Sequence, residues 1–351
     1  MLPQPNALGF SLYLSTFAGQ WSSLAGWTGT GAPVFLSLHI SEEFDGTYCS
    51  RAEEICHRLA SCGFRIIADV SRKTLCQFGY DSLAALAEHL QLWALRIDYG
   101  FDRQEIIALA EKMPIVLNAS TITAEDAKAI AGQGREVFAM HNFYPRPETG
   151  LDEEYLMETT KGLQAAGLKV LAFIPGDTQL RGPVYEGLPT LEAHRKALPS
   201  AAFVDLALRF GMDGIFVADP GLSGKEAERI RRFCEEGVIS IPAHLAEEYE
   251  SLYDRVFTCR VDSPKWLIRV LESREYSCKG KVVAPQNCAE RTMGTITIDN
   301  EKYGRYTGEI QIIRSHLKAD DRVNVIGHIP ESAWLLQERI RGGQKFMLVR
   351  P

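Results

Sequence analysis

Eight short apolar runs alternate with segments of helical spacing over the first 220 residues of the chain. The runs are almost continuously hydrophobic, which is typical of parallel strands buried on both faces. They occupy residues 9–14, 34–39, 64–69, 95–98, 115–119, 137–141, 170–174 and 214–218. Helical spacing is clearest over residues 51–60, 82–92, 103–112, 153–166 and 225–235.

Eight strand–helix units over roughly 210 residues match a (β/α)8 TIM barrel in number and size. A doubly wound open sheet is the alternative for such an alternating pattern. That fold normally carries a G-x-G-x-x-G turn after its first strand, and no such turn follows Leu14. The pattern therefore favours an α/β protein with a closed barrel.

The alternation of strands and helices ends after Glu236, where short predicted strands follow one another with turn residues between them. Only residues 332–339 in this part read as a helix. The predicted strands cover residues 238–241, 255–261, 294–298, 309–313, 323–326 and 346–349. We therefore expect a TIM-barrel domain over residues 1–240, followed by a small antiparallel β-barrel or sandwich over residues 241–351.

Charge and composition exclude several classes of function. The 38 Lys and Arg against 45 Asp and Glu give a net charge of −7, which argues against a nucleic-acid-binding protein. No apolar stretch reaches the length of a membrane span. No Lys or Arg precedes Arg51 and none of the eight Cys form C-x-x-C, so we expect a cytoplasmic protein with reduced thiols.

Polar residues gather at the carboxyl ends of the predicted strands, where TIM barrels place their active sites. Two histidines there, His39 and His141, resemble metal ligands, but no H-x-H or H-E-x-x-H motif supports a metal site. No lysine follows a strand, which argues against a Schiff-base aldolase. We expect no metal and no cofactor. The predicted rim residues include His39, Asp69, Asp98, Asn118, His141, Asn142 and Tyr144.

The rim combines carboxylates with arginines. Glycoside cleavage requires a pair of carboxylates, and arginines bind phosphate or carboxylate groups. The sequence thus predicts a site for a small anionic substrate. The candidate catalytic carboxylates are Asp69, Asp98, Glu148, Asp177 and Glu192, and the candidate anion ligands are Arg146, Arg181 and Arg195.

Several segments of the chain carry a family resemblance. LHISEE at 38–43, LRIDYGF at 95–101, LNAS at 117–120, HNFYPRPETGL at 141–151, RGP at 181–183 and EGLPTLEAHR at 186–195 occur in this order. Together they resemble the bacterial 6-phospho-N-acetylmuramidase family. The resemblance implies a TIM barrel followed by a cyclophilin-like β-barrel. It also implies cytoplasmic hydrolysis of 6-phospho-N-acetylmuramyl-N-acetylglucosamine in cell-wall recycling, with His194 of the last segment among the substrate-binding residues.

We predict Glu148 as the general acid, because Pro145 and Pro147 would stiffen its loop and desolvate its carboxyl group. Asp98 is the predicted second carboxylate, and Arg181 the predicted phosphate ligand. Asp69, Asp177 and Glu192 are rivals for either catalytic role. Alternatively, Glu148 only pairs with Arg146 or Arg195 to fix the loop.

The competing functional hypothesis is a non-catalytic protein that binds an anionic sugar or a peptide. In that case aromatic side chains, rather than carboxylates, would line most of the pocket. The sequence makes no prediction of the oligomeric state.

Overall fold

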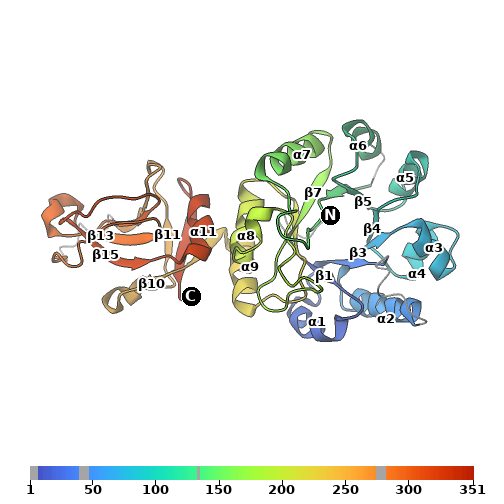
Figure 1. Ribbon diagram of the computed structural model, residues 1–351, viewed down its shortest axis with the longest axis horizontal. Coiled ribbons are helices and arrows are strands. Elements are labelled where there is room, and N and C mark those ends of the chain that lie inside the picture. The colour runs from blue at the N-terminus through green and yellow to red at the C-terminus, as the bar shows by residue number, and fades with distance from the viewer. Residues whose placement is uncertain (1–6, 39–46, 133–134, 274–281) are drawn as a thin grey trace. The chain divides into compact units, whose positions relative to one another are not determined.

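A computed structural model describes residues 7–38, 47–132, 135–273 and 282–351. Contacts divide the chain into two compact units, Met1–Glu226 and Ala227–Pro351 (Figure 1). The division falls inside helix α9 (Gly224–Glu236), which follows the last barrel strand.

The first unit is a closed barrel of eight parallel strands, in which β1 pairs with β8 to complete the ring (Figure 1). This confirms the TIM barrel. Every strand lies within one or two residues of its predicted bounds. The strands are β1 (Ala7–Leu12), β2 (Pro33–Ser37), β3 (Arg65–Val70), β4 (Ala94–Ile97), β5 (Ile115–Asn118), β6 (Val137–Met140), β7 (Lys169–Ile174) and β8 (Gly214–Val217).

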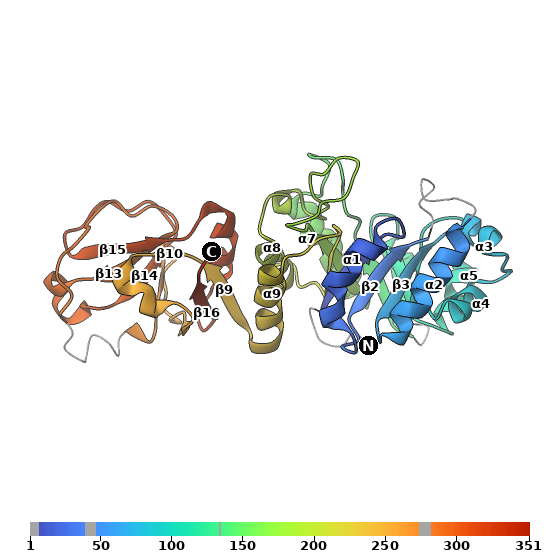
Figure 2. The same cartoon turned by 90° about the horizontal axis from the view of Figure 1, so that it is seen from below.

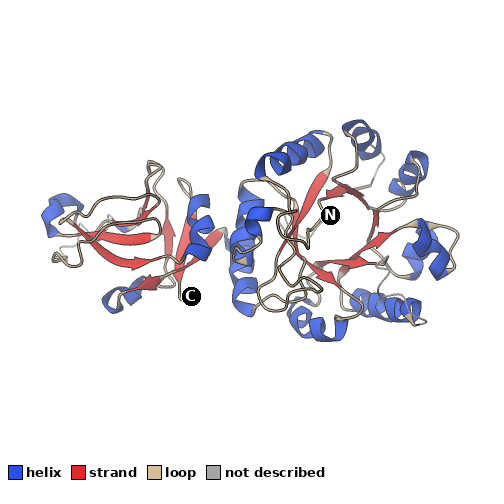
Figure 3. Ribbon diagram, viewed as in Figure 1, coloured by secondary structure: helices blue, strands red, loops and turns tan. Residues whose placement is uncertain are grey.

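Helices cover the outside of the ring (Figure 3). Figure 2 shows α1 and α2 lying over the outer face of β2 and β3. Several helices begin at the side-chain caps that favour helix starts, including Ser82, Asp102, Thr123 and Asp152. The helices are α1 (Phe17–Leu24), α2 (Tyr48–Ser61), α3 (Arg72–Phe78), α4 (Leu83–His89), α5 (Arg103–Ala110), α6 (Ala124–Ala131), α7 (Glu153–Ala165) and α8 (Pro199–Leu208).

The barrel interior is filled by apolar side chains from alternate positions along the strands. Because successive strand residues point to opposite faces, the next residue inward is always two positions further along. The core members include Phe35, Ile67, Ala94, Val116, Phe138, Met140, Leu171, Phe173, Phe216 and Ala218. The inward-facing residues at the carboxyl ends of several strands, two positions after these core members, are polar. They are Ser37, Asp69, Arg96, Asn118 and Asn142.

The second unit consists of two sheets. One is antiparallel, in the order β10-β15-β13-β14-β12, and the other has the order β11-β16-β9. The strand pairing is mostly antiparallel, as expected, and the exception among the described strands is β16, which runs parallel to β9. A long connection separates these two strands in the chain, and such a connection permits parallel pairing.

The strand bounds of this unit are close to the predicted ones. Two very short strands, β10 and β12, were not predicted, and the expected helix is α11 (Trp334–Arg339). The strands are β9 (Val238–Pro242), β10 (His244–Leu245), β11 (Val256–Thr258), β12 (Leu267–Arg269), β13 (Thr295–Asp299), β14 (Ile310–Ile313), β15 (Val323–His328) and β16 (Lys345–Val349). No helix in the described part of the chain is long and apolar enough to cross a membrane.

Candidate active site

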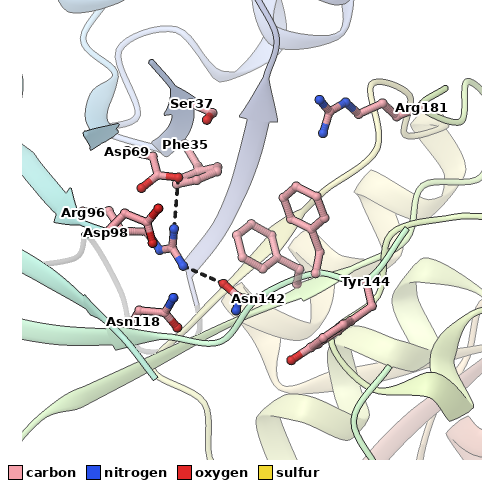
Figure 4. A pocket seen from close by; sticks show the side chains of 11 residues that line it. Phe35, Ser37, Asp69, Arg96, Asp98, Asn118, Asn142, Tyr144 and Arg181 are labelled. Carbon is pink, nitrogen blue, oxygen red and sulfur yellow. Dashed lines mark hydrogen bonds and ion pairs between the residues drawn. The ribbon is translucent and has the colours of Figure 1, made fainter. Parts of the chain in front are cut away.

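A cavity of about 410 Å³ opens at the carboxyl ends of the barrel strands (Figure 4). This is the end at which TIM barrels carry their chemistry. Six of the residues that the sequence predicted for the site line the cavity: Asp69, Asp98, Asn118, Asn142, Tyr144 and Arg181. The other lining residues are Phe35, Ser37, Arg96, Phe143 and Phe173.

Arg96 forms the polar centre of this cavity. Its Nη1 lies 3.0 Å from Oδ2 of Asp69, and its Nη2 donates a 2.6 Å hydrogen bond to Oδ1 of Asn142. Figure 4 shows both interactions as dashed lines. Asp69 and Arg96 are 4% and 5% exposed. A buried guanidinium of this kind stabilises the ionised form of the carboxylate beside it.

Strand register explains why these groups meet. Asp69 on β3 pairs with Arg96 on β4, so both side chains leave the sheet at the same level. Asp98 follows two positions after Arg96 and therefore returns to the inward face. It lines the cavity and is half-buried. The two strands thus bring two carboxylates and one guanidinium to one place.

Two asparagines complete the polar lining. Asn118 uses its Oδ1 to accept the backbone N–H of Ser120 at 3.0 Å, which fixes the turn after β5. Asn142 donates from Nδ2 to the Ser120 hydroxyl at 3.4 Å while accepting from Arg96. The amide groups are therefore oriented before any ligand arrives.

Aromatic rings form the apolar wall of the cavity. Phe173 on β7 packs edge to face against Phe35 and Phe143, with ring centroids 5.6 and 5.1 Å apart. Tyr144 follows Phe143 in the loop after β6, and its N–H donates to the Pro189 carbonyl at 3.0 Å. Such edge-to-face pairs keep the rings in fixed orientations.

Arg181 enters the cavity from the loop after β7, on the side away from Arg96 (Figure 4). Asp219, just after β8, organises this loop by accepting backbone N–H groups of Gly176, Arg181 and Leu188 at 2.9 to 3.0 Å. Desolvation raises the pKa of Asp219, and the three N–H donors counteract that effect. Asp219 therefore acts as a loop anchor.

Glu192 and Arg195 form a separate structural cluster outside the cavity lining. The Glu192 carboxylate accepts the N–H groups of Glu148 and Gly150 at 2.9 and 2.7 Å, and Arg195 donates to both of its oxygens at 2.6 Å. Arg195 also donates to the carbonyls of Gly187 and Arg146. These bonds join the loops after β6 and β7. The Arg195 hydrogen bonds lower the pKa of Glu192 to about 2.

Glu148 does not line the cavity. Its side chain is exposed, so the desolvation on which its predicted acid role depended is absent, and this premise is wrong. Its backbone has φ of 69°, an unusual value for a residue with a side chain, and the Glu192 acceptor holds its N–H. In the alternative interpretation Glu148 pairs with Arg146 or Arg195, and the structure shows the Arg195 guanidinium bound to Glu192 instead.

Three further predicted residues make contacts in the surrounding framework. His141 is fully buried, its Nε2 lies 3.1 Å from the Thr160 hydroxyl of α7, and burial lowers its pKa to about 4. His194 is also buried, with Nε2 2.8 Å from Asp205 of α8. Asp177 accepts the N–H of Ser223 at 2.7 Å, just before α9.

The last two predicted positions are Arg146 and His39. Arg146 is exposed and contributes its backbone carbonyl to the Arg195 cluster. His39 lies outside the described residues. Ser223 lies just before α9, and its hydroxyl accepts the N–H of Glu226 at 3.3 Å, as in a helix cap.

Two family models account for almost the whole chain. The N-terminal model of 6-phospho-N-acetylmuramidase matches residues 8–232, and the C-terminal model matches residues 239–349. The chain belongs to the 6-phospho-N-acetylmuramidase family. The glycosidase class that the sequence predicted is supported by this membership.

Two solved structures resemble this family member over nearly their full lengths. A conserved protein of unknown function from Enterococcus faecalis is 30% identical, with a TM-score of 0.85, and the match covers 98% of this chain and 96% of that one. An uncharacterised Bacillus cereus protein is 22% identical, with a TM-score of 0.80, over 98% and 99% of the two chains. No protein with a curated description matches the sequence.

Sequence reasoning missed Arg96, the residue that connects Asp69 with Asn142 in this 6-phospho-N-acetylmuramidase family member. A signal was present, because Arg96 is a lone charge inside an apolar strand and stands two positions before Asp98. Within the described ranges, no group of three or more His, Cys, Asp or Glu side chains is arranged to hold a metal ion.

Proposed function

We propose that this chain hydrolyses the glycosidic bond of 6-phospho-N-acetylmuramyl-N-acetylglucosamine, in cytoplasmic recycling of cell-wall sugars. The observation that carries the proposal is the cavity itself, which combines two carboxylates with an arginine on its far side. Its volume of about 410 Å³ lies in the range of small-molecule sites. The substrate offers a phosphate, a lactyl carboxylate and a glycosidic bond to these groups.

Asp98 is the general acid in this proposal. Asp69 is buried and its Oδ2 forms an ion pair with Arg96, so we assign it an electrostatic role rather than proton donation. Asp98 is half-buried in the same cavity and can deliver a proton to the leaving glycosidic oxygen. Protonation of that oxygen lets the bond break without expelling an alkoxide.

Asp69 provides the negative charge that the transition state needs. Glycoside cleavage passes through an oxocarbenium-like state, which an adjacent fixed carboxylate stabilises. Arg96 and Asn142 hold this arrangement rigid, because Arg96 bonds to both residues. The same carboxylate can orient the 2-acetamido group of the substrate toward the anomeric carbon.

Arg181 binds the 6-phosphate in this proposal. Its guanidinium lines the cavity, and within the described part of the chain it forms no ion pair with a carboxylate. Guanidinium groups bind phosphate in bidentate fashion. Phe143 and Tyr144 line the same cavity and offer aromatic faces on which a sugar ring can stack.

For the second unit we propose a cyclophilin-like β-barrel, from the family resemblance and the two sheets described above. Superposition of this unit on a cyclophilin tests that assignment, with matching strand order as the expected result. The shape alone implies no prolyl isomerase activity.

The experiment that tests the function compares two substrates. The purified protein is incubated with the muramyl disaccharide carrying the 6-phosphate, and separately with its unphosphorylated form. We expect mass spectrometry to detect N-acetylmuramic acid 6-phosphate and N-acetylglucosamine from the first substrate, with much slower cleavage of the second. Binding without cleavage of either disaccharide would instead support a sugar-binding protein.

A further inference from the structure

Arg181 lies over the face of an aromatic ring at the rim of the barrel. Its Cζ is 4.0 Å from the ring centroid of Tyr13, the residue that follows β1. Tyr13 is 2% exposed. A guanidinium stacked on an aromatic face is attracted by the electrons of the ring, and burial strengthens this attraction.

Tyr13 is held both by its side-chain hydroxyl and by its backbone. Its hydroxyl donates a 2.6 Å hydrogen bond to the Ala218 carbonyl, and its backbone N–H donates to Oε1 of Gln20 at 3.1 Å. The Gln20 amide in turn donates to the Ser11 carbonyl at 3.0 Å. The hydrogen bond from Tyr13 to Ala218 depends on closure of the barrel, because β1 pairs with β8.

The backbone of Arg181 is anchored at the same place. Its N–H donates to Oδ1 of Asp219, which directly follows Ala218 in the chain. The residues after β8 therefore hold the tyrosine hydroxyl with one carbonyl and the arginine backbone with one carboxylate. This arrangement fixes the start and the end of the Arg181 side chain independently.

A guanidinium that stacks on an aromatic ring keeps more of its charge and N–H groups available to a ligand than one that pairs with a carboxylate. A carboxylate partner would orient the guanidinium but would also neutralise it and occupy its N–H groups. The ring orients the same plane without neutralising it, and beyond the hydrogen bond with the Tyr13 hydroxyl the guanidinium keeps N–H groups for a ligand. Burial raises the pKa of the Tyr13 hydroxyl well above its ordinary value, so the ring is a neutral phenol.

We infer that Tyr13 is a positioning residue that holds the Arg181 guanidinium ready for the phosphate of a 6-phosphorylated sugar. The inference rests on the proposed function and adds the residue that gives the arginine its orientation. Tyr13 acts through Arg181 and takes no part in the bond cleavage.

The test uses Tyr13→Phe, which keeps the ring, and Tyr13→Leu and Tyr13→Met, which remove it. The readout is the ratio of kcat/KM for the phosphorylated disaccharide to that for the unphosphorylated one. We expect the Leu and Met variants to lower this ratio about tenfold, mainly through KM, and Tyr13→Phe to keep most of it. Calorimetric binding of N-acetylmuramic acid 6-phosphate gives the same comparison without catalysis.

Arg181→Leu supplies the decisive control, since Tyr13→Leu should have no further effect on the ratio in that background. An unchanged ratio and unchanged sugar phosphate affinity in the ring-less variants would overturn the inference, as would an equal loss in the Arg181→Leu background. Failure of the wild-type protein to cleave the phosphorylated disaccharide would refute the proposed function separately, because the calorimetric comparison still decides the role of Tyr13.

Discussion

The Arg96 guanidinium lies 3.0 Å from the Asp69 carboxylate, and the two residues are paired neighbours on β3 and β4. Both side chains are buried. The pair is therefore part of the barrel core and of the cavity lining at once. Removing one partner would leave a buried charge without compensation, which is costly.

We expect Arg96→Met to lower the free energy of unfolding by about 3–5 kcal/mol, because it leaves the Asp69 charge buried beside an apolar group. Urea denaturation followed by circular dichroism measures this change. The double variant Arg96→Met/Asp69→Asn should recover part of the loss. A single variant within about 1 kcal/mol of wild type would show that the pair is not coupled as described.

Arg181→Leu should raise KM for the phosphorylated disaccharide and erode the preference for it over the unphosphorylated one. The substitution removes the guanidinium that lines the cavity on the side away from Arg96. We expect the preference to fall at least about tenfold, as for loss of a charge-assisted hydrogen bond. Steady-state kinetics on both substrates measure it. Arg146→Leu is the matched control, and an effect there equal to that at position 181 would contradict the assignment.

The buried His141 should make stability depend on pH. Burial lowers its pKa from 6.5 to about 4 in the folded state, so the unfolded chain binds the proton more readily. Its contribution is therefore complete above pH 6.5 and is lost as the pH falls from 6.5 toward 4. Over the 1.5 pH units from 6.5 to 5 this amounts to about 2 kcal/mol.

Urea titrations at pH 7.5 and pH 5 measure this difference. His141→Gln should reduce it by about 2 kcal/mol, whereas the same change at the exposed His316 should leave it unaltered. Equal pH dependence in wild type and His141→Gln would show that another group is responsible.

The variant Glu192→Gln distinguishes a structural role of Glu192 in holding the loops from a catalytic role. The variant weakens the bonds to Arg195 and to the N–H groups of Glu148 and Gly150, so we expect a stability loss of about 1–3 kcal/mol. Because Glu192 does not line the cavity, kcat should fall less than about tenfold. A loss of about 10²-fold or more in kcat with normal stability would return Glu192 to the catalytic candidates.

The barrel could be predicted because its strands are continuous apolar runs with clear boundaries. Helix α8 gave no such signal, since nine of its ten residues are buried and it lacks a polar face. The strands β10 and β12 have two and three residues, too few for an alternating pattern. The parallel pairing of β16 with β9 depends on tertiary contacts between distant segments.

The site was predictable in location and only partly in detail. Asp69, Asp98 and Arg181 reach the cavity, as their places at strand ends indicated. Glu192 and Arg195 have the same residue types but bind one another three positions apart, which sequence composition cannot reveal. Tyr13 was hidden in an apolar run, because its role depends on the closure of β1 against β8.

Asp69 and Asp98 line the cavity together with Arg96, and in the proposed reaction these two carboxylates perform the cleavage. The most direct measurement is the release of N-acetylglucosamine from the 6-phosphorylated disaccharide by wild type, Asp98→Asn and Glu148→Gln, each checked for normal folding. We expect Asp98→Asn to lower kcat at least about 10²-fold, as for loss of a general acid, and Glu148→Gln to remain near wild type. Near-full turnover by Asp98→Asn together with loss of turnover by Glu148→Gln would contradict the claim and place the acid in the loop after β6.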